Sequence, residues 1–187
     1  MLQVENLGIF LLAYKAIRYG VINLIRSLLP ESRFQQLNRR LLVAQGAVLA
    51  DDTVVYSSVK VSRMVRLVVG SGSFIGSNSV FTGGAGSTVH IGRDCDISNH
   101  VHFVTGTHEI GTAGIRRAGS GLSKNISVGD GVWIGYRSLL LPGVRIGRGA
   151  IIAAGSVVVQ DIPEDVLAGG VPCRQLKNLP HVDGAWL

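Results

Sequence analysis

Residues 128–158, VGDGVWIGYRSLLLPGVRIGRGAIIAAGSVV, decide the fold because an aliphatic side chain returns at every sixth position. The aliphatic positions are Val128, Ile134, Leu140, Ile146, Ile152 and Val158. A small residue follows most of them directly, at Gly129, Gly135, Gly147 and Ala153. A period of six fits neither an α-helix nor strands joined by hairpins. It is typical of a solenoid in which each hexapeptide supplies a short strand and a turn.

The same period recurs towards the N-terminus in shorter blocks, which begin at Val43, Val69 and Ile91. The register changes between the blocks, notably through the glycine-rich residues 82–87. Three hexapeptides close one triangular coil, and stacked coils bury a continuous column of Ile, Val and Leu. We therefore predict an all-β fold, a parallel β-helix, over residues 41–163.

The composition agrees with a turn-rich β protein. Of 187 residues, 25 are glycine, 47% are hydrophobic and 16% are charged, which excludes a coiled coil and a disordered chain. Cys95 and Cys173 are too few for a disulfide scaffold and have no CxxC partner, so we expect reduced thiols. The net charge of +6 favours polyanions, anionic membranes or a phosphorylated ligand. Aromatic residues make up only 6% and no RNA- or DNA-binding motif is present, so we expect no nucleic-acid partner.

The N-terminal segment, residues 1–40, is predicted to be helical. Its apolar stretch from Leu7 to Leu29 is interrupted by Lys15, Arg18, Asn23 and Arg26. Central cations cost about 2.5–3.5 kcal/mol each in a bilayer, so we expect no membrane-spanning helix, and no signal peptide either. Apolar side chains recur at helical spacing, at Phe10, Tyr14, Ile17, Val21, Leu24, Ile25 and Leu28.

Two interpretations of this helix stay open. It packs on its own protein or on a neighbouring subunit, or it lies as a basic amphipathic helix on a membrane surface. We expect a cytoplasmic protein, peripheral to the inner face of the membrane in the second case.

One long segment interrupts the repeat. Residues 105–127 are rich in Gly, Ser, Arg and Thr and keep no period of six. A loop of this length is usually functional, so we expect an extruded loop at about 105–127. The repeat ends at Ile162-Pro163, and residues 164–187 are predicted to form a short C-terminal tail.

Three passages resemble the hexapeptide-repeat, left-handed β-helix acyltransferases. They are HFVTGTHEIG (102–111), VGDGVWIGYRSLLLPGVRIG (128–147) and IAAGSVVVQDIPEDVLAGGVPCRQLK (152–177). The likeness is to O-acetyltransferases of the galactoside/maltose type and to relatives that modify surface polysaccharides. The resemblance implies a homotrimer that binds acetyl-CoA in the groove between neighbouring β-helices, with a sugar or glycan as acceptor and no metal.

His108 matches the catalytic histidine of that family, so the resemblance implies that it is the general base. A sugar hydroxyl is a poor nucleophile at neutral pH, and neutral imidazole is suited to taking its proton during attack on a thioester. The same ring can then protonate the departing CoA thiolate. Glu109, Asp94, Asp96 or a backbone carbonyl would orient the ring, and the sequence does not choose among them.

The resemblance also assigns residues to the two substrates. For acetyl-CoA these are Trp133, Gly135, Tyr136, Ala153, Ala154, Arg174 and Lys177. For the acceptor we expect His90, His102, Arg116 and Arg117, with His90 beside His108 if the coil has 18 residues there. The chain has Val159-Gln160 where many relatives have Thr-Lys, and Tyr136 is bulkier than the residue often found there.

Three alternative functions stay open. A xenobiotic or amino-sugar N-acetyltransferase would use the same fold with an amine acceptor. A γ-class carbonic anhydrase would need zinc, but the spacing of His100, His102 and His108 lacks that family's ligand pattern. A non-catalytic scaffold would bind no CoA.

Overall fold

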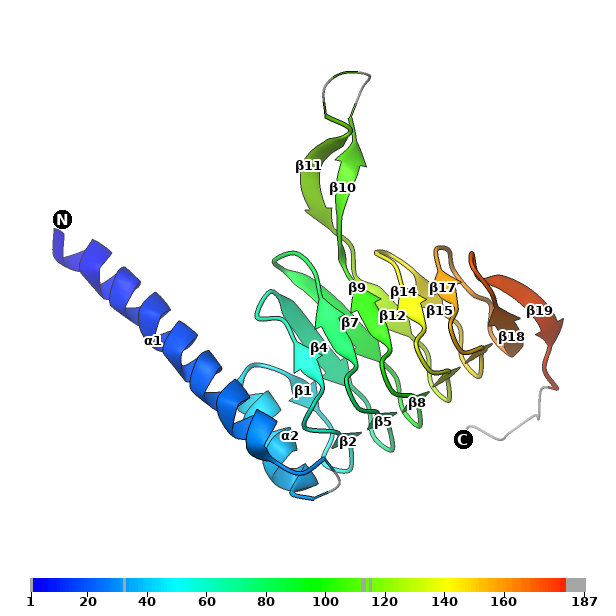
Figure 1. Ribbon diagram of the computed structural model, residues 1–187, viewed down its shortest axis with the longest axis horizontal. Helices are drawn as coiled ribbons and strands as arrows, with labels where there is room; N and C mark the ends of the chain where they lie inside the picture. The colour runs from blue at the N-terminus through cyan, green and yellow to red at the C-terminus, as the bar shows by residue number, and fades with distance from the viewer. Residues whose placement is uncertain (1, 32, 112–113, 115, 181–187) are drawn as a thin grey trace.

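Two helices precede a β-helix in the computed structural model, which describes residues 2–31, 33–111, 114 and 116–180, with side chains from residue 13 onward (Figure 1). Helix α1 (Leu2–Leu28) is long, and much of it extends beyond the β-helix. Helix α2 (Gln35–Ala44) ends before Gly46, whose positive φ of 104° terminates the helix without the steric cost of a side chain.

Short strands, all parallel except β19, form three sheets, here called A, B and C. Sheet A contains β1 (Val48–Leu49), β4 (Val65–Val69), β7 (Ser87–Ile91), β12 (Ile126–Val128) and β15 (Arg145–Ile146). Sheet B contains β2 (Val54–Val55), β5 (Phe74–Ile75), β8 (Asp96–Ile97), β13 (Trp133–Ile134), β16 (Ile151–Ile152), β18 (Val166–Gly169) and β19 (Arg174–Asn178). Sheet C contains β3 (Lys60–Val61), β6 (Val80–Thr82), β9 (His102–Val104), β14 (Leu139–Leu140) and β17 (Val157–Val158). The chain visits A, B and C in turn, which confirms the predicted parallel β-helix.

The core is the column of inward-pointing residues that the six-residue period predicts. Ile75, Ile97 and Ile134 are fully buried on successive strands of sheet B. On sheet C the rings of Phe81 and Phe103 stack with their centroids 4.6 Å apart. Cys95 and Cys173 are free and buried, and burial raises the pKa of both thiols. The other side chains of each strand point outward, where they are available for contacts with solvent, ligands or other chains.

All departures from the hexapeptide repeat lie at the edge between sheets C and A, here called the C–A edge. Regular coils place partners 18 residues apart, as at Trp133 and Ile151. The offset is 20 residues between Val54 and Phe74 and 22 between Phe74 and Asp96. It rises to 37 between Asp96 and Trp133. The inward residues of sheets A, B and C keep their spacing of six elsewhere, so the C–A edge absorbs every insertion.

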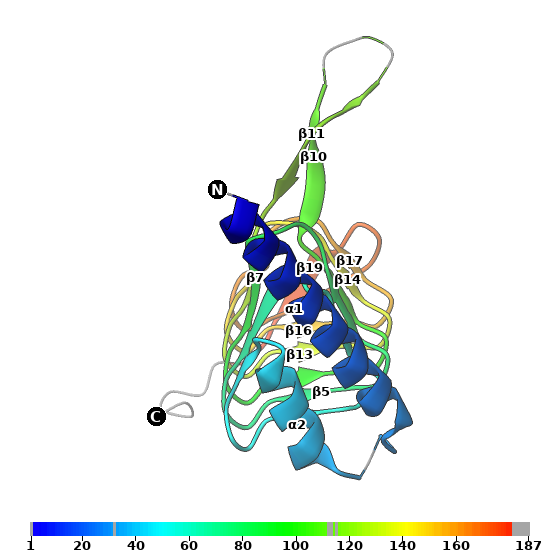
Figure 2. The same ribbon diagram turned by 90° about the vertical axis from the view of Figure 1, so that its left-hand side faces the viewer.

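The largest insertion is a β-hairpin rather than an irregular loop. Strands β10 (Gly106–Ile110) and β11 (Ala118–Ser123) pair antiparallel, with an irregularity between His108 and Ile110. Both views show the hairpin projecting away from the β-helix (Figures 1 and 2). The segment expected to be an extruded loop at 105–127 is therefore extruded, but it has regular structure of its own.

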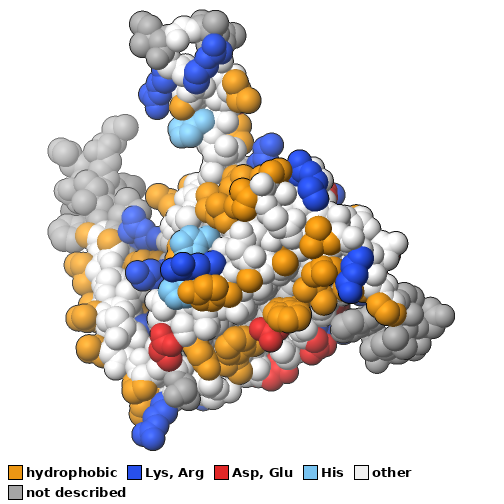
Figure 3. Space-filling model, turned by 45° about the vertical axis from the view of Figure 1, so that its right-hand side comes forward, with side chains coloured by type: hydrophobic (Ala, Val, Ile, Leu, Met, Phe, Trp, Pro, Cys, Tyr) orange, Lys and Arg blue, Asp and Glu red, His pale blue; other side chains and the backbone are white. Residues whose placement is uncertain are grey.

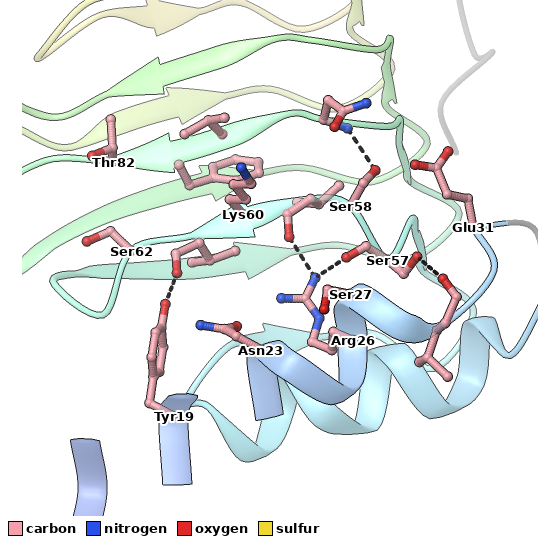
Figure 4. A pocket seen from close by; sticks show the side chains of 16 residues that line it. Tyr19, Asn23, Arg26, Ser27, Glu31, Ser57, Ser58, Lys60, Ser62 and Thr82 are labelled. Carbon is pink, nitrogen blue, oxygen red and sulfur yellow. Dashed lines mark hydrogen bonds between the residues drawn. The ribbon is translucent and has the colours of Figure 1, made fainter. Parts of the chain in front are cut away.

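Helix side chains cap the first coil on all three sheets. Arg39 donates to the carbonyl oxygen of Leu49 on sheet A at 3.4 Å. Asn38 donates to that of Val55 on sheet B. On sheet C, Arg26 donates to Val59 O and Tyr19 to Val61 O (Figure 4). These carbonyls face away from the second coil, so the helices supply the partners that a further coil would have supplied. At the other end β19 pairs antiparallel with β18.

Candidate active site

The hairpin fixes the orientation of the His108 imidazole. His108 lies on β10, exposed to solvent, and its Nδ1 is 3.0 Å from the carbonyl oxygen of Gly119 on β11. A carbonyl oxygen can only accept a hydrogen bond, so in the neutral ring Nδ1 carries the hydrogen. Nε2 is then left with its lone pair, which is the arrangement that a general base needs.

Glycines on β11 allow this contact. A Cβ atom at Gly119 would lie 3.0 Å from the carbonyl oxygen of Glu109, so only glycine brings the two strands this close without displacement. Gly121 pairs directly with His108 and has no side chain to cover the ring. The backbone carbonyl is thus the orienting group that the sequence left undecided, in preference to Glu109. Asp94 and Asp96 lie at or next to sheet B, away from the hairpin.

No motif in the sequence identifies Gly119, although Gly119 and Gly121 alternate in the segment that breaks the repeat. That alternation was the available signal, because glycine every second residue leaves one face of a strand bare.

A shallow hollow of about 650 Å³ adjoins His108 at the root of the hairpin. It is lined by the turn Gly83–Ala85, by Gly106 and Thr107, and by Leu122. A side chain at Gly83 would collide with Thr105, since its Cβ would lie 1.9 Å from Thr105 Oγ1. The glycines of this lining place backbone groups at the surface of the hollow.

The residues expected to bind acetyl-CoA gather elsewhere, on sheet B and the neighbouring turns. Trp133 points outward from β13 with 53% of its surface exposed. Tyr136 follows in the next turn, where its ring lies 5.5 Å from that of His100 and the Arg137 guanidinium carbon lies 5.4 Å from its centroid. Gly135 is required by packing whatever it binds, because a Cβ there would lie 2.6 Å from Ala154 N.

The two basic residues expected at the nucleotide end are exposed on β19. Arg174 pairs with Gly169 and Lys177 with Leu167 of β18. Ala153 and Ala154 follow β16, the strand that pairs with the other side of β18. These residues therefore share sheet B and its borders with Trp133.

A single chain does not bring His108 and the residues expected to bind acetyl-CoA together. The hairpin leaves the β-helix between β9 of sheet C and β12 of sheet A, which is the C–A edge. Sheet B is the one face that does not border this edge. His108 and Trp133 therefore lie on opposite sides of the β-helix.

The expected acceptor residues do not converge on His108 either. His90 lies on β7 and pairs with Ser127 of β12. An 18-residue coil would have placed His108 beside His90, but the chain forms the hairpin there instead. His102 points outward from β9 of sheet C. Arg116 and Arg117 are exposed near the hairpin tip, where Figure 3 shows basic side chains beyond a histidine. The hairpin thus combines His108 with exposed cationic side chains.

Two stretches match known families. Residues 125–160 match the family described as Bacterial transferase hexapeptide (six repeats). Residues 66–101 match the Hexapeptide repeat of succinyl-transferase. Over 96 residues the chain is 39% identical to the galactoside O-acetyltransferase of Escherichia coli, an alignment that covers 51% of this chain and 47% of that protein. The chain spans about half the length of the curated relatives it matches.

Two solved structures match a larger share of this chain. A hexapeptide-repeat acetyltransferase from Vibrio cholerae, complexed with acetyl coenzyme A, is 28% identical with a TM-score of 0.72, and the match covers 90% of this chain and 89% of that one. A galactoside acetyltransferase in complex with coenzyme A is 25% identical with a TM-score of 0.72, covering 90% of this chain and 82% of that one. These findings confirm the resemblance to the hexapeptide-repeat acyltransferases.

Proposed function

We propose that the protein is an acetyl-CoA-dependent O-acetyltransferase that acts on a hydroxyl of a sugar or surface glycan. The observation that carries the proposal is the His108 imidazole, whose Nδ1 faces the Gly119 carbonyl while its Nε2 stays available. The fold that holds this ring is shared with structures that contain acetyl-CoA or CoA.

The reaction follows from that tautomer. Nε2 of His108 takes the proton of the acceptor hydroxyl as its oxygen attacks the thioester carbonyl carbon. The C–S bond then breaks, the acetyl group stays on the acceptor oxygen, and Nε2 returns the proton to the CoA thiolate. No acyl-enzyme forms, and the backbone N–H groups of the glycine-lined hollow are suited to stabilising the oxyanion.

The site is completed between two copies of the chain, in a homotrimer. His108 and Trp133 lie on opposite sides of one β-helix, so a groove between neighbouring copies is what would unite them. The exposed rings of Trp133 and Tyr136 would contact the acyl-CoA, and the cations of Arg174 and Lys177 suit its phosphates.

The first test compares CoA release by the wild type and by His108→Ala across sugars, nucleotide sugars, glycan fragments and amines. We expect turnover with hydroxyl acceptors and a loss of about 10²–10⁴-fold in the variant, with acetyl-CoA binding retained. Equal turnover in the variant would remove His108 as the base. Turnover with amines alone would instead favour an N-acetyltransferase.

A mixing test addresses the shared site. His108→Ala and a Trp133→Ala/Tyr136→Ala double variant are each expected to show little activity when acetyl-CoA is held near the wild-type KM, and they are coexpressed in equal amounts. Random assortment restores one intact interface in about four, so about a quarter of wild-type activity should return. Mixtures that stay inactive would place both groups in one chain's site and contradict a site shared between copies.

A further inference from the structure

Helix α1 packs on the β-helix with its polar side and turns its apolar side outward. Ile22 and Arg26 are buried against the body, and Tyr19 donates to the first coil. The apolar side chains on the other side have between 41% and 75% of their surface exposed. They are Tyr14, Ile17, Val21, Leu24, Ile25 and Leu28, here called the apolar stripe. Phe10, which shares their spacing, lies outside the residues whose side chains are described.

Polar contacts fix the helix in this orientation. The guanidinium of Arg26, 3% exposed, donates through Nε to Asn38 Oδ1 at 2.7 Å. It also donates through Nη2 to Val59 O at 2.7 Å (Figure 4). Gln45 of the α2 C-terminus bonds to Asn23 at 2.9 Å. Rotating α1 to bury the apolar stripe would leave a buried cation and its acceptors unpaired, so the stripe faces away from this chain. The helix therefore packs on its own protein through Ile22 and Arg26, whereas the stripe is left for either a neighbouring subunit or a membrane surface.

The charges around the stripe have one sign. In residues 13–28 the exposed charged side chains are Lys15 and Arg18, Arg26 is buried against the body, and no residue is acidic. Residues 1–64, which contain both helices and the first coil, hold eight Lys and Arg against four Asp and Glu, a net charge of +4. The remaining residues 65–187 hold ten against eight, a net charge of +2. Two thirds of the excess positive charge thus lies at the end of the molecule that carries the stripe.

We propose that α1 lies on an anionic lipid surface, with the apolar stripe in the boundary between headgroups and acyl chains. The stripe covers a broad arc of the helix, and the exposed Lys15 and Arg18 beside it attract anionic headgroups. The same charges disfavour a second copy on the stripe, because the Lys15 and Arg18 side chains of two copies would repel one another. None of the described helices is long and apolar enough to cross a bilayer.

The test is flotation of the full-length protein with vesicles. One set is phosphatidylcholine alone, and the other contains phosphatidylglycerol at about one part in four. We expect the wild type to bind the anionic vesicles, and raising the salt from about 0.15 M to about 1 M should weaken binding about tenfold or more. A double variant, Ile17→Gln/Leu24→Gln, removes two exposed side chains of the stripe and should also reduce binding about tenfold or more.

The matched control is Ile110→Gln/Val171→Gln, which removes two exposed aliphatic side chains elsewhere and should leave vesicle binding unchanged. Circular dichroism verifies that each variant keeps the fold. Binding that the stripe variant retains would overturn the proposal, as would a wild type that binds neither vesicle. In the second case, a lower particle mass of the stripe variant in light scattering would identify a second copy as the occupant. Neither result depends on the acetyltransferase reaction.

Discussion

Replacing Arg26 by methionine isolates the contacts that hold α1 on the β-helix. Methionine fills the volume of the aliphatic stem but donates no hydrogen bond. The change leaves Asn38 Oδ1, Val59 O and Ser57 O, which accept from the guanidinium at 2.7, 2.7 and 3.3 Å, without their donor. Hydrogen bonds from a charged donor contribute about 1.5–3 kcal/mol each, so the three together amount to about 6 kcal/mol.

Removal of the charge offsets part of that loss. Burial lowers the pKa of Arg26 to about 10, so the group stays protonated at neutral pH. Keeping the cation in this environment costs about 3 kcal/mol, at 1.36 kcal/mol per pKa unit. We therefore expect Arg26→Met to lower the free energy of unfolding by about 3 kcal/mol, which is a large share of the stability of an ordinary domain.

Urea unfolding followed by circular dichroism measures this difference, with both proteins at one concentration because an oligomer's stability depends on it. Arg63→Met is the control, since Arg63 is exposed and its loss should change the free energy by less than about 0.5 kcal/mol. If Arg26→Met also stays within 0.5 kcal/mol of the wild type, then these bonds do not hold α1, and the orientation of the apolar stripe loses its physical basis.

Three further results are expected. Ile134→Ala, at a fully buried position, should lower the free energy of unfolding by about 2–5 kcal/mol in the same urea assay. The Arg93 backbone N–H and guanidinium lower the pKa of Asp130. The ionised carboxylate therefore stabilises the fold above its unfolded pKa, and this stabilisation is lost as the pH falls through the pKa of the folded state. Asp130→Asn should flatten the acid side of a plot of melting temperature against pH, and an unchanged slope would argue against the Arg93–Asp130 pair. Trp133→Ala should raise KM for acetyl-CoA more than it lowers kcat in the CoA-release assay, whereas an unchanged KM would remove Trp133 from the acyl-CoA groove.

The β-helix could be predicted because its signal is local. Each turn needs an inward aliphatic residue and a small one beside it, and residues 128–158 repeat that requirement without interruption. The core depends on this period alone, so its composition follows directly from the sequence.

The hairpin and its contacts could not be predicted in the same way. Strands β10 and β11 are rich in Gly, Ser and Thr, and polar exposed strands lack the alternation that identifies a half-buried strand. The partner of His108 is a backbone carbonyl, which no side-chain motif encodes. His90 was expected beside His108 on the assumption of an 18-residue coil, and the insertion at the C–A edge removes that register.

The orientation of α1 also escaped the sequence, because the usual rule puts an amphipathic helix with its apolar side inward. Here the body offers unpaired carbonyls rather than an apolar surface, so the polar side docks. The side of α1 that packs on the β-helix depends on the groups that the first coil presents, and these are known only from the three-dimensional structure.

The capping of the first coil limits how molecules can associate through the end of the β-helix. A stack of parallel coils has no intrinsic length limit, and a bare terminal coil is a template on which a second molecule's coil can continue the ladder into a fibre. Arg39, Asn38, Arg26 and Tyr19 occupy the carbonyls that would recruit such a neighbour. Removing α1 and α2 would therefore uncover these carbonyls and leave the first coil as an open edge for pairing with another strand.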